Sequence, residues 1–117
     1  ISGGKRAVLI LSDPLCDLDT RKQIMEDLLA EYGADAITFI KPHPRDVLDY
    51  KTLFPQCPQF SAQVPMEVLN FFEGIHFDCV VSVYTELAAI KFADKKIRLS
   101  FDFMDRYEAP EIHRHQI

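Results

Sequence analysis

The chain has 117 residues, of which 48% are hydrophobic and 26% are charged, as is ordinary for one globular domain. This composition excludes a disordered, collagen-like or coiled-coil chain, and no apolar run reaches the roughly 18–20 residues of a membrane span. The net charge of −5 argues against nucleic acid as a partner, because binding to a phosphate backbone normally requires a basic face.

Apolar runs of strand length alternate with segments of helical periodicity along the chain. The expected strands are residues 7–11, 36–40, 77–82 and a half-exposed edge strand over 97–101. The expected helices are residues 20–32, 66–72 and 84–93, with a short helix or an irregular turn in 47–54. This alternation predicts an α/β fold over residues 1–117, with a mainly parallel sheet and helices on both faces.

The start of the first expected helix carries a capping signal. Thr20 and Gln23 fit a capping box, and Asp19 places a negative charge near the positive end of the helix dipole. Asp17 is not needed for this cap and remains available for chemistry. Nothing comparable organises the C-terminal segment from residue 102, which is expected to dock elsewhere or to be disordered.

Ligands of parallel sheets bind beyond the carboxyl ends of the strands. The polar segments that follow the first three expected strands should therefore share one edge of the sheet; they are residues 12–19, 41–46 and 82–85. We expect a site there that binds a small anion.

The strongest signal for chemistry is the segment Lys41-Pro42-His43-Pro44-Arg45-Asp46. Its two prolines stiffen the loop and hold the imidazole between two cationic side chains, an arrangement that suits a phosphate. His43 could also donate a proton to a departing phosphate. The alternative is a proline-rich turn with a solvated histidine.

A second signal lies where the third strand meets the next expected helix. Ser82, Tyr84 and Thr85 would stand beside the unpaired N–H groups of a helix N-terminus, which can bind an anion. The hydroxyl groups could equally well only cap the helix.

A third signal is the set of carboxylates in the loop over residues 13–19. One of them could act as a general base, with Asp17 preferred and Asp19 in reserve; the alternative is a polar loop that begins a helix. Apart from His113 and His115 in the C-terminal segment, the histidines lack the spacing of metal ligands, so no metal is expected. Three cysteines without a CxxC pair, and no signal-peptide core, indicate reduced thiols in a cytoplasmic compartment.

These residues resemble a known family. The Lys-Pro-His-Pro block follows an apolar strand that ends in Ser-Asp-Pro-Leu and precedes a Ser/Thr pair over residues 81–85, the order found in bacterial sialyltransferases with an HP motif. The chain is most similar to glycosyltransferase family 52, the lipooligosaccharide sialyltransferase group, over residues 7–103.

The resemblance implies a Rossmann-like C-terminal half of a GT-B enzyme, which binds the donor nucleotide. The N-terminal acceptor half would then be missing, and the isolated chain would be inactive. The implied donor is CMP-sialic acid, the acceptor is a galactose-type hydroxyl of a surface glycan, and no cofactor or metal is required. The enzyme would be cytoplasmic or peripheral at the cytoplasmic face of the inner membrane, and a homo-oligomer remains open.

The resemblance also implies roles for individual residues. His43 would contact the CMP phosphate as the general acid, and the hydroxyls of Ser82 and Thr85 would bind the same phosphate. Lys41, Pro44, Arg45 and Tyr84 complete the expected donor-binding set. The family's base lies in an acidic pair followed by glycine; here Asp17 and Asp19 are separated by Leu18, and no glycine follows.

Three other functions are compatible with the same residues. One is a transferase of this fold that uses another nucleotide sugar, such as a UDP-sugar. Another is a non-catalytic module that binds a nucleotide or phosphate. The last is a structural domain in which His43 only braces a turn.

Overall fold

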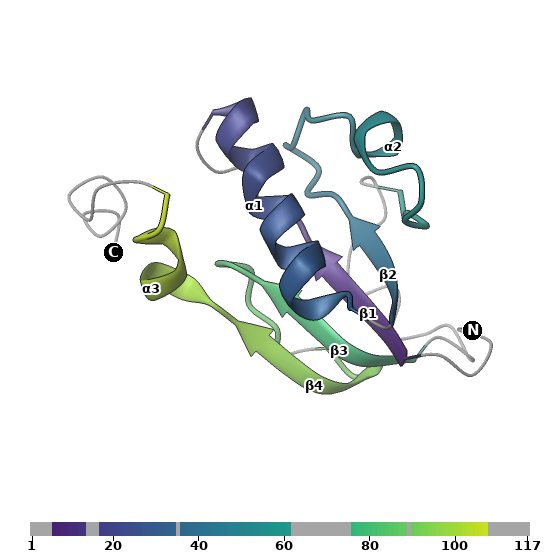
Figure 1. The fold of residues 1–117 in the computed structure, drawn as a ribbon. Coiled ribbons are helices and arrows are strands. Elements are labelled where there is room, and N and C mark those ends of the chain that lie inside the picture. The colour runs from purple at the N-terminus through teal and green to yellow at the C-terminus, as the bar shows by residue number, and fades with distance from the viewer. Residues whose placement is uncertain (1–5, 14–16, 35, 62–75, 89, 108–117) are drawn as a thin grey trace.

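The described residues form a four-stranded sheet with three helices (Figure 1). The structure, a computed structural model, describes residues 6–13, 17–34, 36–61, 76–88 and 90–107. The strands are β1 (Arg6–Leu11), β2 (Ala36–Lys41), β3 (Phe77–Ser82) and β4 (Ala93–Arg98), and the helices are α1 (Leu18–Tyr32), α2 (Tyr50–Leu53) and α3 (Ser100–Met104). The strand order is β2-β1-β3-β4 and every pairing is parallel, which confirms the predicted α/β class and its Rossmann-like character.

The centre of the sheet is apolar on both faces. Val8, Leu9 and Ile10 of β1 are completely buried, as are Val80 and Val81 of β3. Because neighbouring side chains of a strand point to opposite faces, a strand covered on both sides must be apolar throughout. The continuous apolar runs in the sequence therefore identified the two central strands correctly.

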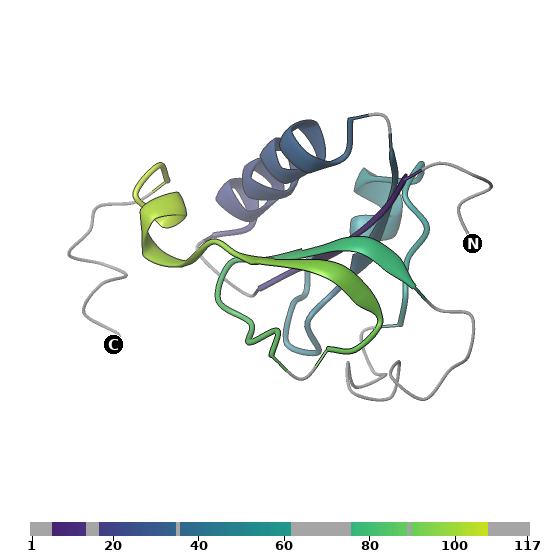
Figure 2. The same ribbon diagram turned by 90° about the horizontal axis from the view of Figure 1, so that it is seen from below.

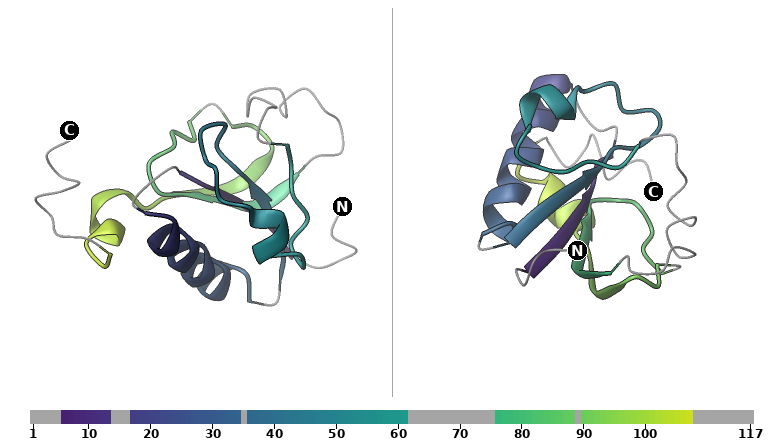
Figure 3. Two further views of the ribbon diagram at one scale, coloured as in Figure 1. Left: turned by 90° about the horizontal axis from the view of Figure 1, so that it is seen from above. Right: turned by 90° about the vertical axis from the view of Figure 1, so that its right-hand side faces the viewer.

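The three described helices contribute to one core, on one face of the sheet. Met25 and Leu28 of α1, Tyr50 of α2 and Phe103 of α3 all belong to this cluster. Leu87, Ile90 and Phe92 cover the opposite face, where they pack against alternate residues of β1 and against Phe77 and Val80 of β3. Figures 2 and 3 show the sheet between these two layers. The helix expected over residues 66–72 lies outside the described residues.

The cap of α1 differs from the prediction. Asp17, rather than Asp19 or Thr20, is the N-cap residue: its Oδ1 accepts a hydrogen bond of 2.7 Å from the Thr20 N–H. Hydrogen bonds from Thr20 lower the pKa of Asp17, so folding favours its ionised form. This contribution to stability is present above the pKa of an unfolded aspartate and is lost as the pH falls through the lowered value.

The helix expected over residues 84–93 does not form in the described residues 84–88 and 90–93. Carboxylate side chains bind the backbone N–H groups with which it would begin: Asp13 accepts from Val83 and Tyr84, and Glu86 accepts from Leu87 and Ala88. Such side-chain bonds compete with the hydrogen bonds of a helix. The segment instead bends across the sheet and leads into β4.

The last strand lies earlier in the chain than its alternating pattern predicts. β4 ends at Arg98, and Ser100, with a φ of 60°, then turns the chain into α3. The N–H groups of Leu99 and Ser100 donate to the carbonyls of Ser82 and Val83, which aligns this corner with the end of β3. The alternation of Ile97 with polar neighbours therefore marked the end of a strand rather than its middle.

The segment after β4 docks on α1 as far as it is described. The hydroxyl of Tyr107 donates to Asp27 of α1, whose other oxygen accepts from Gln23 at 2.9 Å. Arg106 also lies 3.6 Å from Glu31. Docking is thus the correct alternative as far as residue 107.

Among the described residues, every helix is too short or too polar to span a membrane.

Removal of the Tyr107 hydroxyl tests this docking. We expect Tyr107→Phe to lower the free energy of unfolding by about 1 kcal/mol in urea denaturation, since a hydrogen bond to a carboxylate is lost while Asp27 keeps Gln23 as a donor. The matched control is Glu31→Gln, which weakens the exposed ion pair with Arg106 and should change stability by less than about 0.5 kcal/mol. Equal effects of the two variants would contradict the assigned role of Tyr107.

Candidate functional site

Three segments that are distant in sequence meet at the carboxyl edge of the sheet. The Ser12 N–H donates to the Lys41 carbonyl at 3.1 Å, and the Ser12 hydroxyl accepts from the His43 N–H at 2.9 Å. The next residue, Asp13, bonds the turn that follows β3. Residues 12–13 therefore connect the His43 loop to the 82–85 turn, and the expected common edge is confirmed.

Asp13 lies between the carboxyl ends of β1 and β3, where the strand order reverses and α/β sheets usually bind ligands. Its Oδ2 accepts from the N–H groups of Val83 at 3.1 Å and Tyr84 at 3.2 Å. Its Oδ1 accepts from the Thr85 hydroxyl at 2.5 Å. The protein's own carboxylate thus occupies the position where the sequence indicated an external anion.

The 82–85 turn consequently differs from the predicted anion site. It does not begin a helix, and the two N–H groups that would bind an anion are bonded to Asp13. The Ser82 hydroxyl is buried and donates to the Thr85 carbonyl at 2.7 Å. Ser82 and Thr85 are near the ends of β1 and β3, as expected, but in this structure their hydroxyls hold the turn together.

His43 is held in place by its neighbours on both sides. Its N–H donates to the Ser12 hydroxyl, and its carbonyl accepts from the Asp46 N–H at 2.9 Å. Its Nδ1 accepts from the Arg45 N–H at 3.0 Å. In the neutral ring, the proton must then reside on Nε2, because an acceptor Nδ1 carries none. The loop therefore presents the Nε2–H as a hydrogen-bond donor.

A buried ion pair supports the His43 loop from below. Arg21 of α1 lies 2.8 Å from Asp46, and their side chains are 11% and 0% exposed. Asp46 also accepts from the Tyr50 hydroxyl at 2.6 Å and from the Leu48 N–H at 3.1 Å. Burial, followed by the Asp46 carboxylate, raises the pKa of Tyr50. Three donors, from α1, the loop and α2, thus fix one carboxylate.

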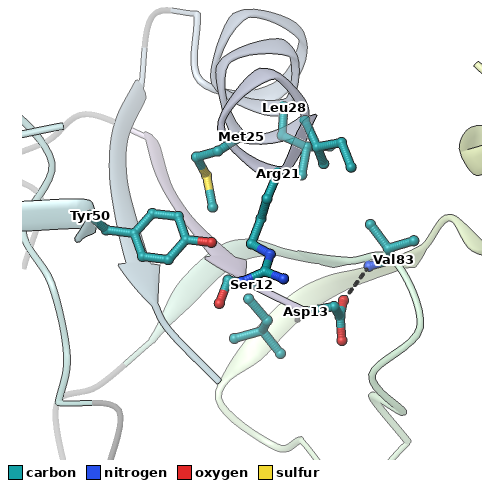
Figure 4. A pocket seen from close by; sticks show the side chains of 9 residues that line it. Ser12, Asp13, Arg21, Met25, Leu28, Tyr50 and Val83 are labelled. Carbon is teal, nitrogen blue, oxygen red and sulfur yellow. Dashed lines mark hydrogen bonds between the residues drawn. The ribbon is translucent and has the colours of Figure 1, made fainter. Parts of the chain in front are cut away.

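A small cavity opens beside this network (Figure 4). Its volume of about 10 Å³ leaves room for roughly one water molecule. Arg21 points from α1 toward the end of β1, with Tyr50 on one side and Asp13 on the other. The polar lining comes from Ser12, Asp13, Arg21 and Tyr50, whereas α1 contributes apolar side chains. This cavity is too small for a nucleotide.

The other expected donor-binding residues are distributed differently. Lys41 is buried, and its ammonium donates to the Ser61 carbonyl at 3.3 Å. Pro44 and Arg45 are exposed in the turn of the loop, and Tyr84 is half-buried in the turn after β3. Lys41 therefore helps to hold residues 59–61 beside β2, whereas Arg45 stays at the surface next to His43.

The carboxylates expected to supply a base lie at the start of α1. Asp17 and Asp19 are both exposed, and Asp17 is engaged as the N-cap. The argument that left Asp17 available for chemistry is therefore wrong, and its lowered pKa makes it a weaker base than an ordinary aspartate. Among the described residues, no three His, Cys, Asp or Glu side chains form a group that could hold a metal ion.

Sequence reasoning missed the roles of Arg21 and Asp46 and understated that of Asp13. Arg21 lies three, four and seven residues before the buried Ile24, Met25 and Leu28, so it stands on the buried side of α1, where an arginine is unusual. The sequence did contain a signal for Asp13. Its Asp-Pro pair follows the first buried strand after one serine, and a polar residue at the end of such a strand is well placed to take part in a site at the edge of the sheet.

The ion pair under the loop yields a stability prediction. We expect Asp46→Ala to lower the free energy of unfolding by about 3 kcal/mol, because it removes the carboxylate that lies against the buried Arg21 guanidinium. The double variant Arg21→Met with Asp46→Ala should recover part of that loss. The control is Glu26→Ala, which breaks the exposed Lys22–Glu26 pair. In urea denaturation this variant should lose less than about 0.5 kcal/mol of its free energy of unfolding. A similar loss in Asp46→Ala and Glu26→Ala would show that the buried pair does not hold the loop.

One curated protein is similar to part of this chain. An uncharacterized protein of Haemophilus influenzae is 31% identical over 75 residues, which are 64% of this chain and 24% of the relative. The chain thus spans about a quarter of the length of that relative. No solved structure matches the chain.

The family model matches all the segments that form the candidate site. The model of glycosyltransferase family 52 matches residues 2–101, which include β1 to β4, the His43 loop and the 82–85 turn. The chain therefore belongs to glycosyltransferase family 52.

Proposed function

We propose that this chain is the donor-binding part of a glycosyltransferase that uses CMP-sialic acid. The sugar would be transferred to a galactose-type hydroxyl of a surface glycan, bound by a further half of the enzyme. Membership of family 52 supports a nucleotide-sugar donor and a glycan acceptor. The parallel sheet supports a nucleotide site beyond its carboxyl edge.

The observation that carries the proposal is the fixed orientation of His43. Ser12, Arg45 and Asp46 bond its N–H, its Nδ1 and its carbonyl. A donor that needs no reorientation can stabilise charge as it develops in the transition state. The Nε2–H would donate to a phosphate oxygen of the donor substrate at the edge of the sheet.

In this reaction, negative charge develops on the leaving phosphate. The bond between the anomeric carbon and the phosphate oxygen breaks, and both electrons leave with the phosphate. The Nε2–H of His43 and the exposed Arg45 would stabilise that charge without a metal. The acceptor hydroxyl attacks the anomeric carbon and loses its proton to a carboxylate. Asp19 is now the better candidate for this base, since Asp17 caps α1.

Substitution of His43 tests the proposal in the full-length protein. We expect His43→Ala to lower the turnover of sialyl transfer by at least roughly tenfold, because one preorganised donor to the leaving phosphate is lost. His43→Gln retains an N–H donor and should recover part of the rate. His76→Ala is the control, because His76 is exposed beside Asp94, at the opposite end of the strands. A near-wild-type rate in His43→Ala would show that His43 has no part in the reaction.

Ligand binding separates this function from its alternatives. We expect CMP to raise the melting temperature more than UMP, ADP or NAD, since a bound ligand at a hundred times its Kd adds about 2.7 kcal/mol to stability. Preference for UMP would instead favour a UDP-sugar donor. CMP binding without transfer in the full-length protein would indicate a non-catalytic nucleotide-binding module.

A further inference from the structure

Arg98 lies at the carboxyl end of β4, beside the candidate site, in a position to which the sequence analysis assigned no role. It pairs in register with Ser82 of β3, and its side chain is exposed. Its Nε donates to the Tyr84 carbonyl at 2.9 Å. The N–H of the same residue donates to Asp13, so Arg98 and Asp13 bind the same turn. Arg98 therefore belongs to the same edge of the sheet as His43 and Asp13.

The bond to Tyr84 orients the guanidinium group of Arg98. It uses the Nε–H, and within the described ranges neither Nη nitrogen makes a hydrogen bond or an ion pair. Two parallel N–H groups of a guanidinium match the two oxygens of a carboxylate in distance and direction. The anchored side chain thus presents a planar cation whose outer edge can bind an oxyanion.

The other cations near this edge are already engaged or assigned to a different role. Arg21 is paired with the buried Asp46, and the Lys41 ammonium is bonded to Ser61. The Val83 and Tyr84 N–H groups are taken by Asp13, whose own charge is offset by these donors and by Thr85. His43 and Arg45 lie on the β2 side of the edge, and Arg98 lies on the β4 side.

We infer that Arg98 binds the carboxylate of the acidic sugar of the donor while His43 binds the phosphate; this inference rests on the proposed function. Ser12 ties His43 to the end of β1, and β1 and β4 are two strands apart, about 10 Å at the usual strand spacing. The Arg98 side chain spans part of that distance when it reaches the turn after β3.

The test compares a ligand that has the carboxylate with one that lacks it. Binding of CMP and of a slowly reacting CMP-3-fluoro-sialic acid to the full-length protein is measured by calorimetry. We expect Arg98→Gln to weaken binding of the sialic acid derivative by roughly tenfold and that of CMP by less than about twofold. Glutamine can still donate to the Tyr84 carbonyl, so the turn should keep its structure. Arg98→Lys, which keeps the charge without the planar pair of donors, should lie between the two.

Lys96→Gln is the matched control for charge and position. Lys96 lies two residues earlier on the same face of β4 and donates to the Ala88 carbonyl at 3.4 Å, so its replacement removes one positive charge and one similar contact. Binding of both ligands should be unchanged in this variant. The melting temperature of each variant shows whether the fold is retained.

Each other outcome overturns the inference in a distinguishable way. An equal loss for both ligands would assign Arg98 to the phosphate rather than to the sugar. Unchanged binding of both ligands by Arg98→Gln would show that Arg98 only clamps the turn. If the wild-type protein bound neither ligand, the proposed function itself would fail together with the role of Arg98.

Discussion

The arrangement of the candidate site depends on the buried ion pair between Arg21 and Asp46. A carboxylate removed from water is tolerated only when charge and hydrogen bonds compensate it, and here Arg21, Tyr50 and Leu48 do so. These partners come from α1, α2 and the loop between β2 and α2. The pair therefore fixes the loop relative to both helices, and within that loop the Arg45 N–H orients the His43 ring.

A second constraint joins the two halves of the sheet. Asp13 extends from the end of β1 and closes the turn that follows β3, while Ser12 supports the loop that follows β2. Two adjacent residues thus connect every segment of the candidate site except Arg98, which meets the same turn from β4. An anionic ligand at this edge would meet His43 and Arg98 as cationic or donor groups and Asp13 as a carboxylate whose oxygens already accept hydrogen bonds from the protein.

The sequence predicts those parts of the fold in which local pattern and tertiary burial agree. The apolar runs of β1 and β3 mark central strands, and the periodic residues of α1 mark its buried side. Prediction failed where side chains from elsewhere overrode the local pattern. Asp13, some 70 residues away, takes the N–H groups of Val83 and Tyr84, and no property of residues 84–93 alone reveals that competition. The pairing of Arg21 with Asp46 depends likewise on the way in which α1 crosses the sheet.

The separation of Asp13 from Thr85 along the chain also bears on how the site is made. Their hydrogen bond joins residues 72 positions apart, and β1 can pair with β3 only after the whole intervening chain has been synthesised. Contacts between residues so far apart in the sequence form slowly, because the entropy of closing the loop is lost before the contacts that compensate it have formed. A nascent chain in which only β1, β2 and the His43 loop have emerged therefore has no binding edge yet. In that chain β1 is paired with β2 on one side and remains unpaired on the other until β3 has been synthesised.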